Sequence, residues 1–196
     1  LLLLFLITVA WLAIVAPPSR TLRPIAPPSV TLLASNGGLI SRRGAVTDSP
    51  VDVRQLPPHV SEAFLAIEDR RFYHHIGVDP RGIARAAWHD ARAGHMQEGG
   101  STITQQLAKL VYLSADRTAA RKLREALIAM WLEAWLTKDQ ILSRYLSDVY
   151  FGDNVYGLRA AARHYFSKRP EALTVSEAAL LAGLMKAPSR LAPSAN

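Results

Sequence analysis

Apolar residues recur at helical spacing in almost every segment after residue 58, and this pattern limits the fold more than any other feature of the 196-residue chain. Helix boundaries are also visible, because Asp79-Pro80 is a capping residue followed by proline and Ala187-Pro188 ends the last segment. We therefore expect a mostly α fold. The predicted helices cover residues 61–72, 80 onward, 101–113, 117–136, 137–150, 155–166 and 176–186.

The first 16 residues carry no charge. A membrane-spanning helix needs about 20 apolar residues. The chain begins without Met, so we interpret residues 1–16 as a transmembrane anchor that is truncated at its start. The alternative is a cleaved signal peptide. Pro17 and Pro18 argue against cleavage, because proline directly after a cleavage site is unfavourable.

Residues 17–55 are interpreted as a stalk between this anchor and the main domain at 56–196. The stalk begins with a proline-rich stretch, which favours extended backbone. Two β-prone segments follow, Val30 to Ala34 and Leu39 to Val46, on either side of an Asn-Gly turn signal. The stalk is therefore predicted to contain a short β-hairpin.

The net charge of the chain limits the classes of molecule that it is expected to bind. Net charge is +7, which suits nucleic acid, an anionic membrane surface or a phosphorylated substrate. No zinc-ligand spacing or nucleic-acid-binding motif is present, so nucleic acid is disfavoured. A basic domain beside an anchor favours an anionic lipid or a lipid diphosphate. The absence of cysteine is compatible with any compartment.

A first charged cluster occupies residues 68–77. In a continuous helix Phe64, Glu68 and Phe72 would be four residues apart and share one face. A carboxylate among aromatic rings is partly desolvated, which makes it a better base near neutral pH. Asp69 would point about 100° away in such a helix. The alternative for Glu68 is a glutamate that pairs with a neighbouring arginine in water.

A second cluster, Arg121, Lys122 and Glu125, falls on one face of the predicted helix at 117–136. Here the basic residues precede the acid, whereas surface salt bridges stabilise a helix better when the acid precedes the base. A solvated stripe of salt bridges is the alternative. The cluster is thus a candidate anion-binding site that contains a second carboxylate.

Between the clusters lies a glycine-led helix start. Gly99 and Gly100 allow the backbone to approach a ligand closely. Ser101 or Thr102 is expected to cap the helix that follows. We expect the unpaired N–H groups at its start to form an anion site.

Further candidate ligand contacts follow along the same segment. Gln105 and Lys109 are four residues apart, so they are expected to face one ligand, and Gln106 lies beside them. Arg117, just before the next helix, is a further candidate contact for a diphosphate.

In this order and spacing the motifs resemble those of the family 51 glycosyltransferases, the peptidoglycan polymerases that act on lipid II, over about Leu56 to Pro193. The resemblance implies a lysozyme-like helical glycosyltransferase domain that joins lipid II units by β-1,4 bonds, with inversion, and releases undecaprenyl pyrophosphate. It implies that Glu68 is the general base and Glu125 the second essential carboxylate. The implied substrate contacts are Gly100, Ser101, Thr102, Gln105, Gln106, Lys109, Arg117, Arg121 and Lys122. Supporting roles are expected for Asp69, Phe72, His75 and Gly77.

The sequence departs from the family pattern at three positions. Ser143 stands where the family usually has Glu, Ser147 where it usually has Asn, and Glu98 where Gln is more common. These changes put local stability or the detail of the donor site in doubt, but not the reaction class.

Two other functions compete with polymerisation. A lysozyme-like glycan hydrolase would also use two carboxylates, and a degenerate, non-catalytic module would only bind lipid II. The many cations and the expected anchor argue against the hydrolase. By analogy with other phosphoryl-bearing substrates Mg²⁺ or Mn²⁺ would assist, although no residue pattern in the sequence forms a metal site.

The resemblance also implies partners and a location. The expected location is the bacterial inner (plasma) membrane, with a single-pass anchor and the catalytic domain on the periplasmic or extracellular side. The expected partners are lipid II, the growing glycan strand and other cell-wall synthesis proteins. The sequence leaves open whether a transpeptidase domain, as in bifunctional class A penicillin-binding proteins, belongs to the same protein.

Overall fold

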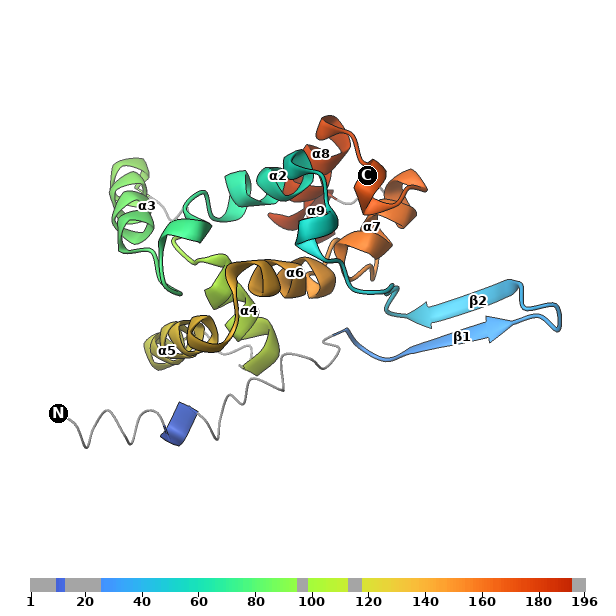
Figure 1. Ribbon diagram of the computed structural model, residues 1–196, viewed down its shortest axis with the longest axis horizontal. Helices are drawn as coiled ribbons and strands as arrows, with labels where there is room; N and C mark the ends of the chain where they lie inside the picture. The colour runs from blue at the N-terminus through green and yellow to red at the C-terminus, as the bar shows by residue number, and fades with distance from the viewer. Residues whose placement is uncertain (1–9, 13–25, 95–98, 113–117, 192–196) are drawn as a thin grey trace. The chain divides into compact units, whose positions relative to one another are not determined.

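The computed structural model describes residues 10–12, 26–94, 99–112 and 118–191, and these residues are mostly helical, which confirms the predicted fold class (Figure 1). Short 3-10 helices are labelled η. In chain order the elements are β1 (Ser29–Leu33), β2 (Leu39–Gly44), η2 (Val53–Gln55), α2 (Pro58–Glu68), η3 (Phe72–His74), α3 (Pro80–Ala93), α4 (Ile103–Tyr112), α5 (Ala119–Trp135), α6 (Lys138–Asp148), α7 (Leu158–Phe166), η4 (Pro170–Ala172), α8 (Val175–Met185) and α9 (Pro188–Leu191).

The chain divides into two compact units. One comprises residues 1–23 and 68–145, and the other comprises residues 24–67 and 146–196. The first unit holds η3, α3, α4, α5 and most of α6, whereas the second holds the hairpin, most of α2 and the helices from α7 onward.

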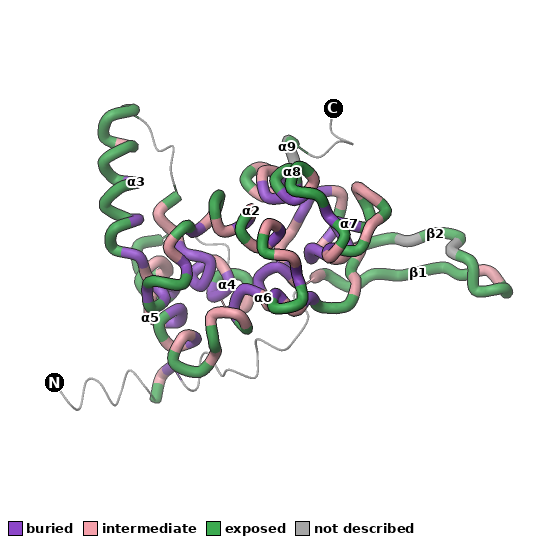
Figure 2. Tube along the Cα trace, turned by 45° about the horizontal axis from the view of Figure 1, so that its top comes forward, coloured by how far each residue is buried: buried purple, intermediate pink, exposed green. Residues whose placement is uncertain are grey.

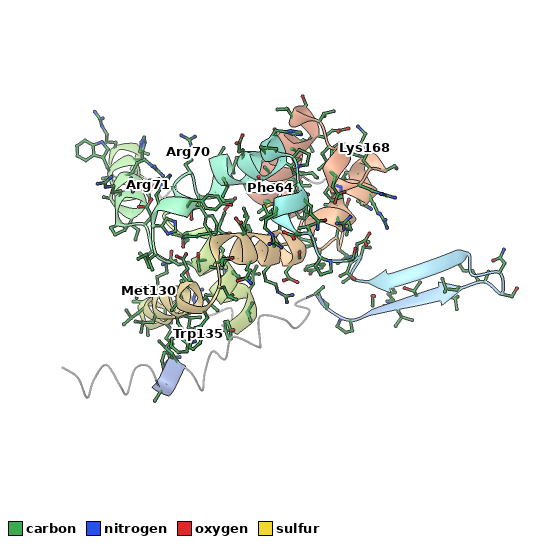
Figure 3. The ribbon with its side chains drawn as sticks, in the orientation of Figure 1. Phe64, Arg70, Arg71, Met130, Trp135 and Lys168 are labelled. Atoms are coloured by element: carbon green, nitrogen blue, oxygen red, sulfur yellow. The ribbon has the colours of Figure 1, made fainter. Side chains whose placement is uncertain are left out.

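The core of the first unit forms where α4 packs along α5 (Figure 1). Ala108 of α4 and the α5 residues Ile128 and Leu132 are fully buried there, together with Leu12 from the N-terminal segment. The outer side of α5 is less covered, because Met130 and Trp135 are exposed (Figure 3). Residues 10–12 therefore contribute to the same core as the two helices.

Helix α3 begins as the sequence predicts, because the Asp79 side chain accepts the N–H of Arg81 at 3.2 Å. Its apolar side chains take an unexpected position. Ile83 is 44% exposed and Trp88 is 63% exposed, and α3 is exposed along most of its length (Figure 2). The buried positions are the small residues Gly82 and Ala86. This unit therefore buries the small face of α3.

The helix predicted over residues 61–72 begins and ends earlier than expected, at Pro58 and Glu68. Helix α2 ends at Glu68, and the chain turns before η3 begins at Phe72. The shared helical face that was expected for Glu68 and Phe72 is therefore wrong. Because the helix ends at Glu68, Asp69 lies outside it, and the expected angle of about 100° between the two side chains does not apply.

The predicted hairpin is confirmed in the second unit. Strands β1 and β2 pair antiparallel, with Ser29 opposite Gly44. Asn36 stabilises the turn by accepting the Gly38 N–H at 2.9 Å. Gly37 adopts a φ of 79°, a left-handed conformation that glycine reaches without the steric cost of a side chain. The strands are exposed along nearly their whole described length (Figure 2).

Helix α7 begins three residues later than predicted. The preceding residues are used in isolated bridges, Val155 with Val46 and Tyr156 with Tyr150. Gly157 ends this segment at a φ of 87°, and a Cβ atom there would lie 2.3 Å from the Ser147 carbonyl oxygen. These bridges therefore keep residues 155–157 out of the helix that was predicted to begin at residue 155.

Most of the predicted anchor and the proline-rich start of the predicted stalk lie outside the described residues, which include only 10–12 of the first 25. Within the described ranges, no helix combines the length and apolar character that crossing a bilayer requires. The boundaries of the anchor, stalk and main domain stay predictions.

Candidate active site

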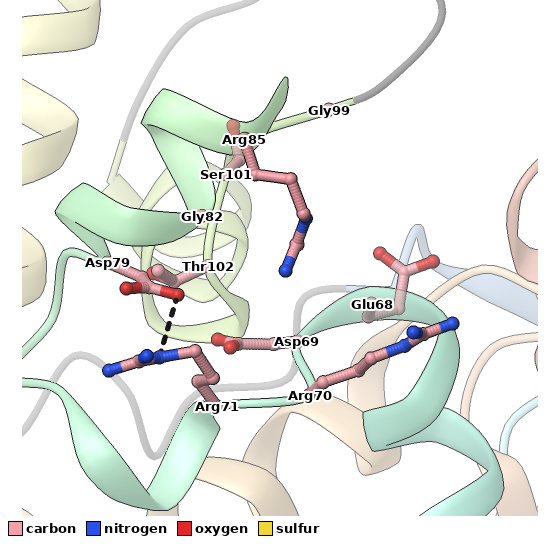
Figure 4. Close-up of a pocket in the computed structure, with 11 residues that line it drawn as sticks. Glu68, Asp69, Arg70, Arg71, Asp79, Gly82, Arg85, Gly99, Ser101 and Thr102 are labelled. Carbon is pink, nitrogen blue, oxygen red and sulfur yellow. Dashed lines mark ion pairs between the residues drawn. The ribbon is translucent and has the colours of Figure 1, made fainter. Parts of the chain in front are cut away.

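A polar pocket in the first unit brings together the end of α2, the start of α3 and the approach to α4 (Figure 4). Its lining combines carboxylates, guanidinium groups and glycines. The lining residues are Glu68, Asp69, Arg70, Arg71, Asp79, Gly82, Arg85, Gly99, Gly100, Ser101 and Thr102. The pocket thus contains residues from the first cluster and from the glycine-led segment.

The Glu68 carboxylate is held by a side chain of α4. Gln106 donates from Nε2 to Glu68 Oε2 at 2.7 Å, and its Oε1 accepts the Tyr145 hydroxyl at 2.8 Å. Glu68 was expected among aromatic rings, but the group bonded to its carboxylate is the amide of Gln106, and arginines line the same pocket. The half-buried Gln106 therefore orients this carboxylate. The sequence had indicated Gln106 only as a substrate contact.

Asp69 lies beside Glu68 in the pocket lining and has a different set of partners. Its carboxylate accepts from His75 Nε2 at 2.9 Å and from the Ile103 N–H at 3.1 Å. Both Asp69 and His75 are buried, and the His75 ring packs edge-on against Phe72 with centroids 6.2 Å apart. Asp69 therefore links the loop after α2 to the first residue of α4.

The start of α4 is closed by its own residues. Thr102 accepts the Gln105 N–H at 3.1 Å, and Gln105 accepts the Thr102 N–H at 3.0 Å, which is a reciprocal capping box. The N–H groups of Thr102, Ile103 and Gln105, which were expected to be unpaired, thus have partners within the protein. Gln105 is 1% exposed whereas Lys109 is exposed, so the two do not face one ligand as predicted.

Glycines allow the helices of this unit to approach closely. Gly77 has a φ of 72°, and a Cβ atom there would lie 2.7 Å from the Met130 backbone nitrogen in α5. Its carbonyl oxygen accepts the Thr102 hydroxyl at 2.6 Å. Gly100 approaches α3, where a Cβ atom would lie 3.3 Å from Ile83 Cα. Gly77 and Thr102 therefore join the loop before α3 to both α4 and α5.

The second cluster is not a solvated stripe. Glu125 is only 2% exposed and accepts from both Lys122 and Arg121, the latter at 3.4 Å. Lys122 also donates to Ser101 Oγ at 2.7 Å. A buried carboxylate thus positions two cations, and one of them reaches the pocket lining at Ser101.

Sequence reasoning missed the arginines that line the pocket. Arg71 pairs with Asp79 at 3.5 Å, and Arg85 extends from α3 into the pocket (Figure 4). Arg70 lines the pocket as well and is also marked in the wider view (Figure 3). The signal for Arg85 was the pair of small residues Gly82 and Ala86, which mark the face of α3 that packs closely.

Two carboxylates of the site, Glu125 and Asp69, do not fit a divalent metal ion. In the described ranges, no group of three or more His, Cys, Asp or Glu side chains could hold one. Glu125 is bonded to two cationic side chains, and Asp69 is bonded to His75 and a backbone N–H. These donors already satisfy the oxygens that Mg²⁺ or Mn²⁺ would require.

Other predicted residues have simpler placements. Arg117 and Glu98 lie outside the described residues, and Ser143 lies in α6. The departure at Ser147 has a structural use in the second unit, because its hydroxyl accepts the Val51 N–H at 3.0 Å. The serine thus satisfies a backbone group that is distant in sequence.

The comparison with protein families agrees with this arrangement of motifs. Residues 36–196 match the family model described as transglycosylase. The chain belongs to the transglycosylase family. Among proteins similar to this family member, penicillin-binding protein 1A of Escherichia coli (strain K12) is 48% identical over 162 residues, which are 83% of this chain and 19% of that protein.

Two further relatives have similar coverage. Penicillin-binding protein 1F of Bacillus subtilis (strain 168) is 46% identical over 84% of this chain and 23% of its own length. Penicillin-binding protein 1A of Aquifex aeolicus (strain VF5) is 43% identical over 90% of this chain and 24% of its own length. The transglycosylase chain thus spans about a fifth to a quarter of the relatives it matches.

Proposed function

We propose that this chain is a peptidoglycan glycosyltransferase, which polymerises lipid II into β-1,4-linked glycan strands and releases undecaprenyl pyrophosphate. The observation that carries the proposal is the position of the Glu68 carboxylate, which Gln106 orients at 2.7 Å beside an arginine-lined pocket. A base beside several fixed cations suits attack by a hydroxyl group on a sugar whose leaving group is a diphosphate.

In the proposed reaction Glu68 removes the proton from the 4-hydroxyl of the acceptor GlcNAc. The resulting oxygen nucleophile forms a bond to C1 of the donor MurNAc while the bond from C1 to the diphosphate oxygen breaks. One displacement converts the α-linked donor into a β-1,4 link. The electron pair leaves with undecaprenyl pyrophosphate, so no general acid is required.

Charge on the departing diphosphate is the largest electrostatic demand of this step. We propose that Lys109, Arg117, Arg121 and Lys122 meet it, with help from the arginines of the pocket. Glu125 is then a positioning residue, because it is buried and bonded to both Arg121 and Lys122. No step is assigned to Mg²⁺ or Mn²⁺.

We propose that the remaining predicted residues act indirectly, by shaping the pocket. Gly100, Ser101 and Thr102 line the pocket, and Thr102 and Gln105 also shape it by capping α4. Asp69 and His75 fix the loop that follows Glu68, and Gly77 sets its distance from α5. These residues support the pocket without touching the reacting atoms.

The proposed setting is the bacterial inner membrane, with the catalytic domain on its periplasmic or extracellular side. Supporting this are the uncharged residues 1–16 and relatives that are penicillin-binding proteins. The proposed partners are lipid II, the growing glycan strand, a transpeptidase domain or protein, and other proteins of cell-wall synthesis.

The test is glycan formation from purified lipid II in detergent, with the wild-type chain and Glu68→Gln. The amide keeps the shape of the side chain but cannot take the proton, so wild type should form polymer and the variant should form none. Glu62→Gln is the matched control, because it makes the same change at an exposed position of α2. Its activity should equal that of wild type.

Other outcomes distinguish the competing functions. Short fragments released from preformed glycan, with no polymer from lipid II, would identify a lysozyme-like hydrolase. Binding of lipid II without turnover of either substrate would identify a non-catalytic module. Polymer formation by Glu68→Gln at the wild-type rate would remove Glu68 as the base.

A further inference from the structure

Tyr145, on α6, is the end of a chain of hydrogen bonds that reaches Glu68. Its hydroxyl donates to Gln106 Oε1 at 2.8 Å, and Gln106 Nε2 donates to Glu68 Oε2 at 2.7 Å. All three residues belong to the first unit. From sequence alone Tyr145 would be assigned to the core, where an aromatic ring on a helix has no further role.

The direction of both hydrogen bonds follows from the chemistry of the groups. An ionised carboxylate only accepts, so the Gln106 NH₂ group must face Glu68. The amide oxygen then faces Tyr145, and the phenol must donate to it. If the amide turned over, its oxygen would meet the carboxylate, and two acceptors would repel each other. The Glu68 carboxylate therefore selects this orientation of Gln106, and the Tyr145 hydroxyl holds it by donating to the amide oxygen.

Burial makes Tyr145 a fixed donor. Its side chain is 1% exposed, so solvent does not compete for the hydroxyl. Burial, together with the negative charge of Glu68, raises the pKa of Tyr145 well above its usual value of 10.0. The phenol thus keeps its proton near neutral pH.

We infer that Tyr145 is a positioning residue for Glu68 and acts through Gln106. This inference rests on the proposed function, in which Glu68 takes the acceptor proton. Gln106 holds Oε2, which leaves Oε1 to face the acceptor hydroxyl. A base fixed in this way loses less freedom when it reaches the transition state, so the benefit appears in kcat and not in substrate binding.

The experiment measures kcat and KM for lipid II polymerisation with Tyr145→Phe, Gln106→Met and the double variant. Phenylalanine keeps the buried ring and removes one neutral hydrogen bond. We expect kcat to fall about 2- to 12-fold, the rate equivalent of one such bond, with KM within about twofold of wild type. Tyr165→Phe is the control, because it removes a tyrosine hydroxyl bonded to the Phe151 carbonyl in the second unit.

The double variant separates positioning from a structural role. If Tyr145 acts through Gln106, the double variant should be no slower than Gln106→Met alone. If the two losses multiply, or if Tyr145→Phe has the wild-type kcat, the inference is overturned. Thermal unfolding of each variant checks that equal amounts of folded protein are compared.

A second substitution covers loss of folding. Should Tyr145→Phe lower the folded fraction, Gln106→Asn breaks the same chain at a half-buried position by shortening the amide. The same fall in kcat at constant KM is then expected, and a wild-type kcat overturns the inference.

Glu68→Gln distinguishes failure of the inference from failure of the proposed function. If wild type forms polymer, Glu68→Gln forms none and Tyr145→Phe matches wild type, only the inference fails. If wild type forms no polymer, or if Glu68→Gln is fully active, the proposed function fails and the inference fails with it.

Discussion

The carboxylate of Asp69 accepts the backbone N–H of Ile103 at 3.1 Å, although the two residues are 34 positions apart in sequence. Asp69 thereby satisfies a donor at the start of α4 that would otherwise be unpaired. The same carboxylate accepts from the buried His75. One side chain thus fixes both the loop that follows Glu68 and the helix that carries Gln106.

Replacing Asp69 should lower stability according to what the new side chain can accept. Asp69→Ala leaves the Ile103 N–H and the His75 ring without their partner in a buried site, so the free energy of unfolding should fall by about 1–3 kcal/mol. Asp69→Asn retains an oxygen for Ile103 and should lose less. Urea unfolding measures both. Equal losses in the two variants would show that the hydrogen bond to Ile103 has no part in stability.

Two glycines with nearly the same backbone conformation should respond differently to alanine. Gly77 and Gly94 have φ values of 72° and 70°, but a Cβ atom at Gly77 meets the α5 backbone whereas one at Gly94 meets nothing within 4 Å. Gly94→Ala should cost about 1 kcal/mol from the left-handed conformation alone. Gly77→Ala should cost roughly 2–4 kcal/mol, because overpacking is added. Similar unfolding midpoints for the two variants would contradict the close contact with α5.

The buried carboxylate of Glu133 should matter for stability. It accepts from Lys138 Nζ at 2.7 Å and from the Thr104 hydroxyl at 2.6 Å, and its side chain is 5% exposed. Glu133→Ala leaves a cation and a hydroxyl without this partner, so unfolding should become easier by about 3–5 kcal/mol. Glu62→Ala, at an exposed position, should change stability by less than about 0.5 kcal/mol. Chemical denaturation of both variants measures the difference.

Loss of the Lys122 cation should slow polymerisation. Lys122 is held between the buried Glu125 and Ser101, with Nζ 2.7 Å from Ser101 Oγ. Lys122→Met retains the apolar length of the side chain, and kcat should fall about 10²- to 10³-fold if the ammonium stabilises the departing diphosphate. Lys186→Met, at an exposed position after α8, should be as active as wild type. Full activity of Lys122→Met would remove Lys122 from the proposed mechanism.

Acid should weaken the second unit through Glu177. Lys168 donates to its carboxylate, and the Thr174 N–H also bonds to it in a capping box, which together lower the pKa of Glu177 to about 2 from 4.5. Because the folded state holds the proton more weakly than the unfolded state, this contribution is present above about pH 4.5 and is lost as pH falls towards 2.

Glu177→Gln tests that contribution. The variant should be less stable than wild type at pH 6, and the difference should shrink as pH falls from about 4.5 to 2. Thermal unfolding at several pH values measures it. Glu171→Gln is a comparison at a second carboxylate, which pairs with Arg159 at 3.2 Å. A constant difference between wild type and Glu177→Gln across this range would contradict the linkage.

The local features of the fold were readable in the sequence. The Asp79 cap, the Thr102 cap, the hairpin turn at Asn36 and the helix starting after Thr137 all appear in the structure. Each depends on groups a few residues apart, and short-range hydrogen bonding is encoded by local residue types. The same reasoning failed for the end of α2, because nothing near Glu68 in sequence resembles a helix stop.

The sequence by itself determined that the chain is mostly helical, where most helices begin, and which two carboxylates accompany the basic motifs. Only the tertiary structure decided what each polar group bonds to. It placed Asp69 on Ile103, buried Gln105, brought Arg85 into the pocket and joined Tyr145 to Glu68 through Gln106. The reason is physical: a buried donor or acceptor must find a partner wherever the packed helices supply one, and that partner is often far away along the chain.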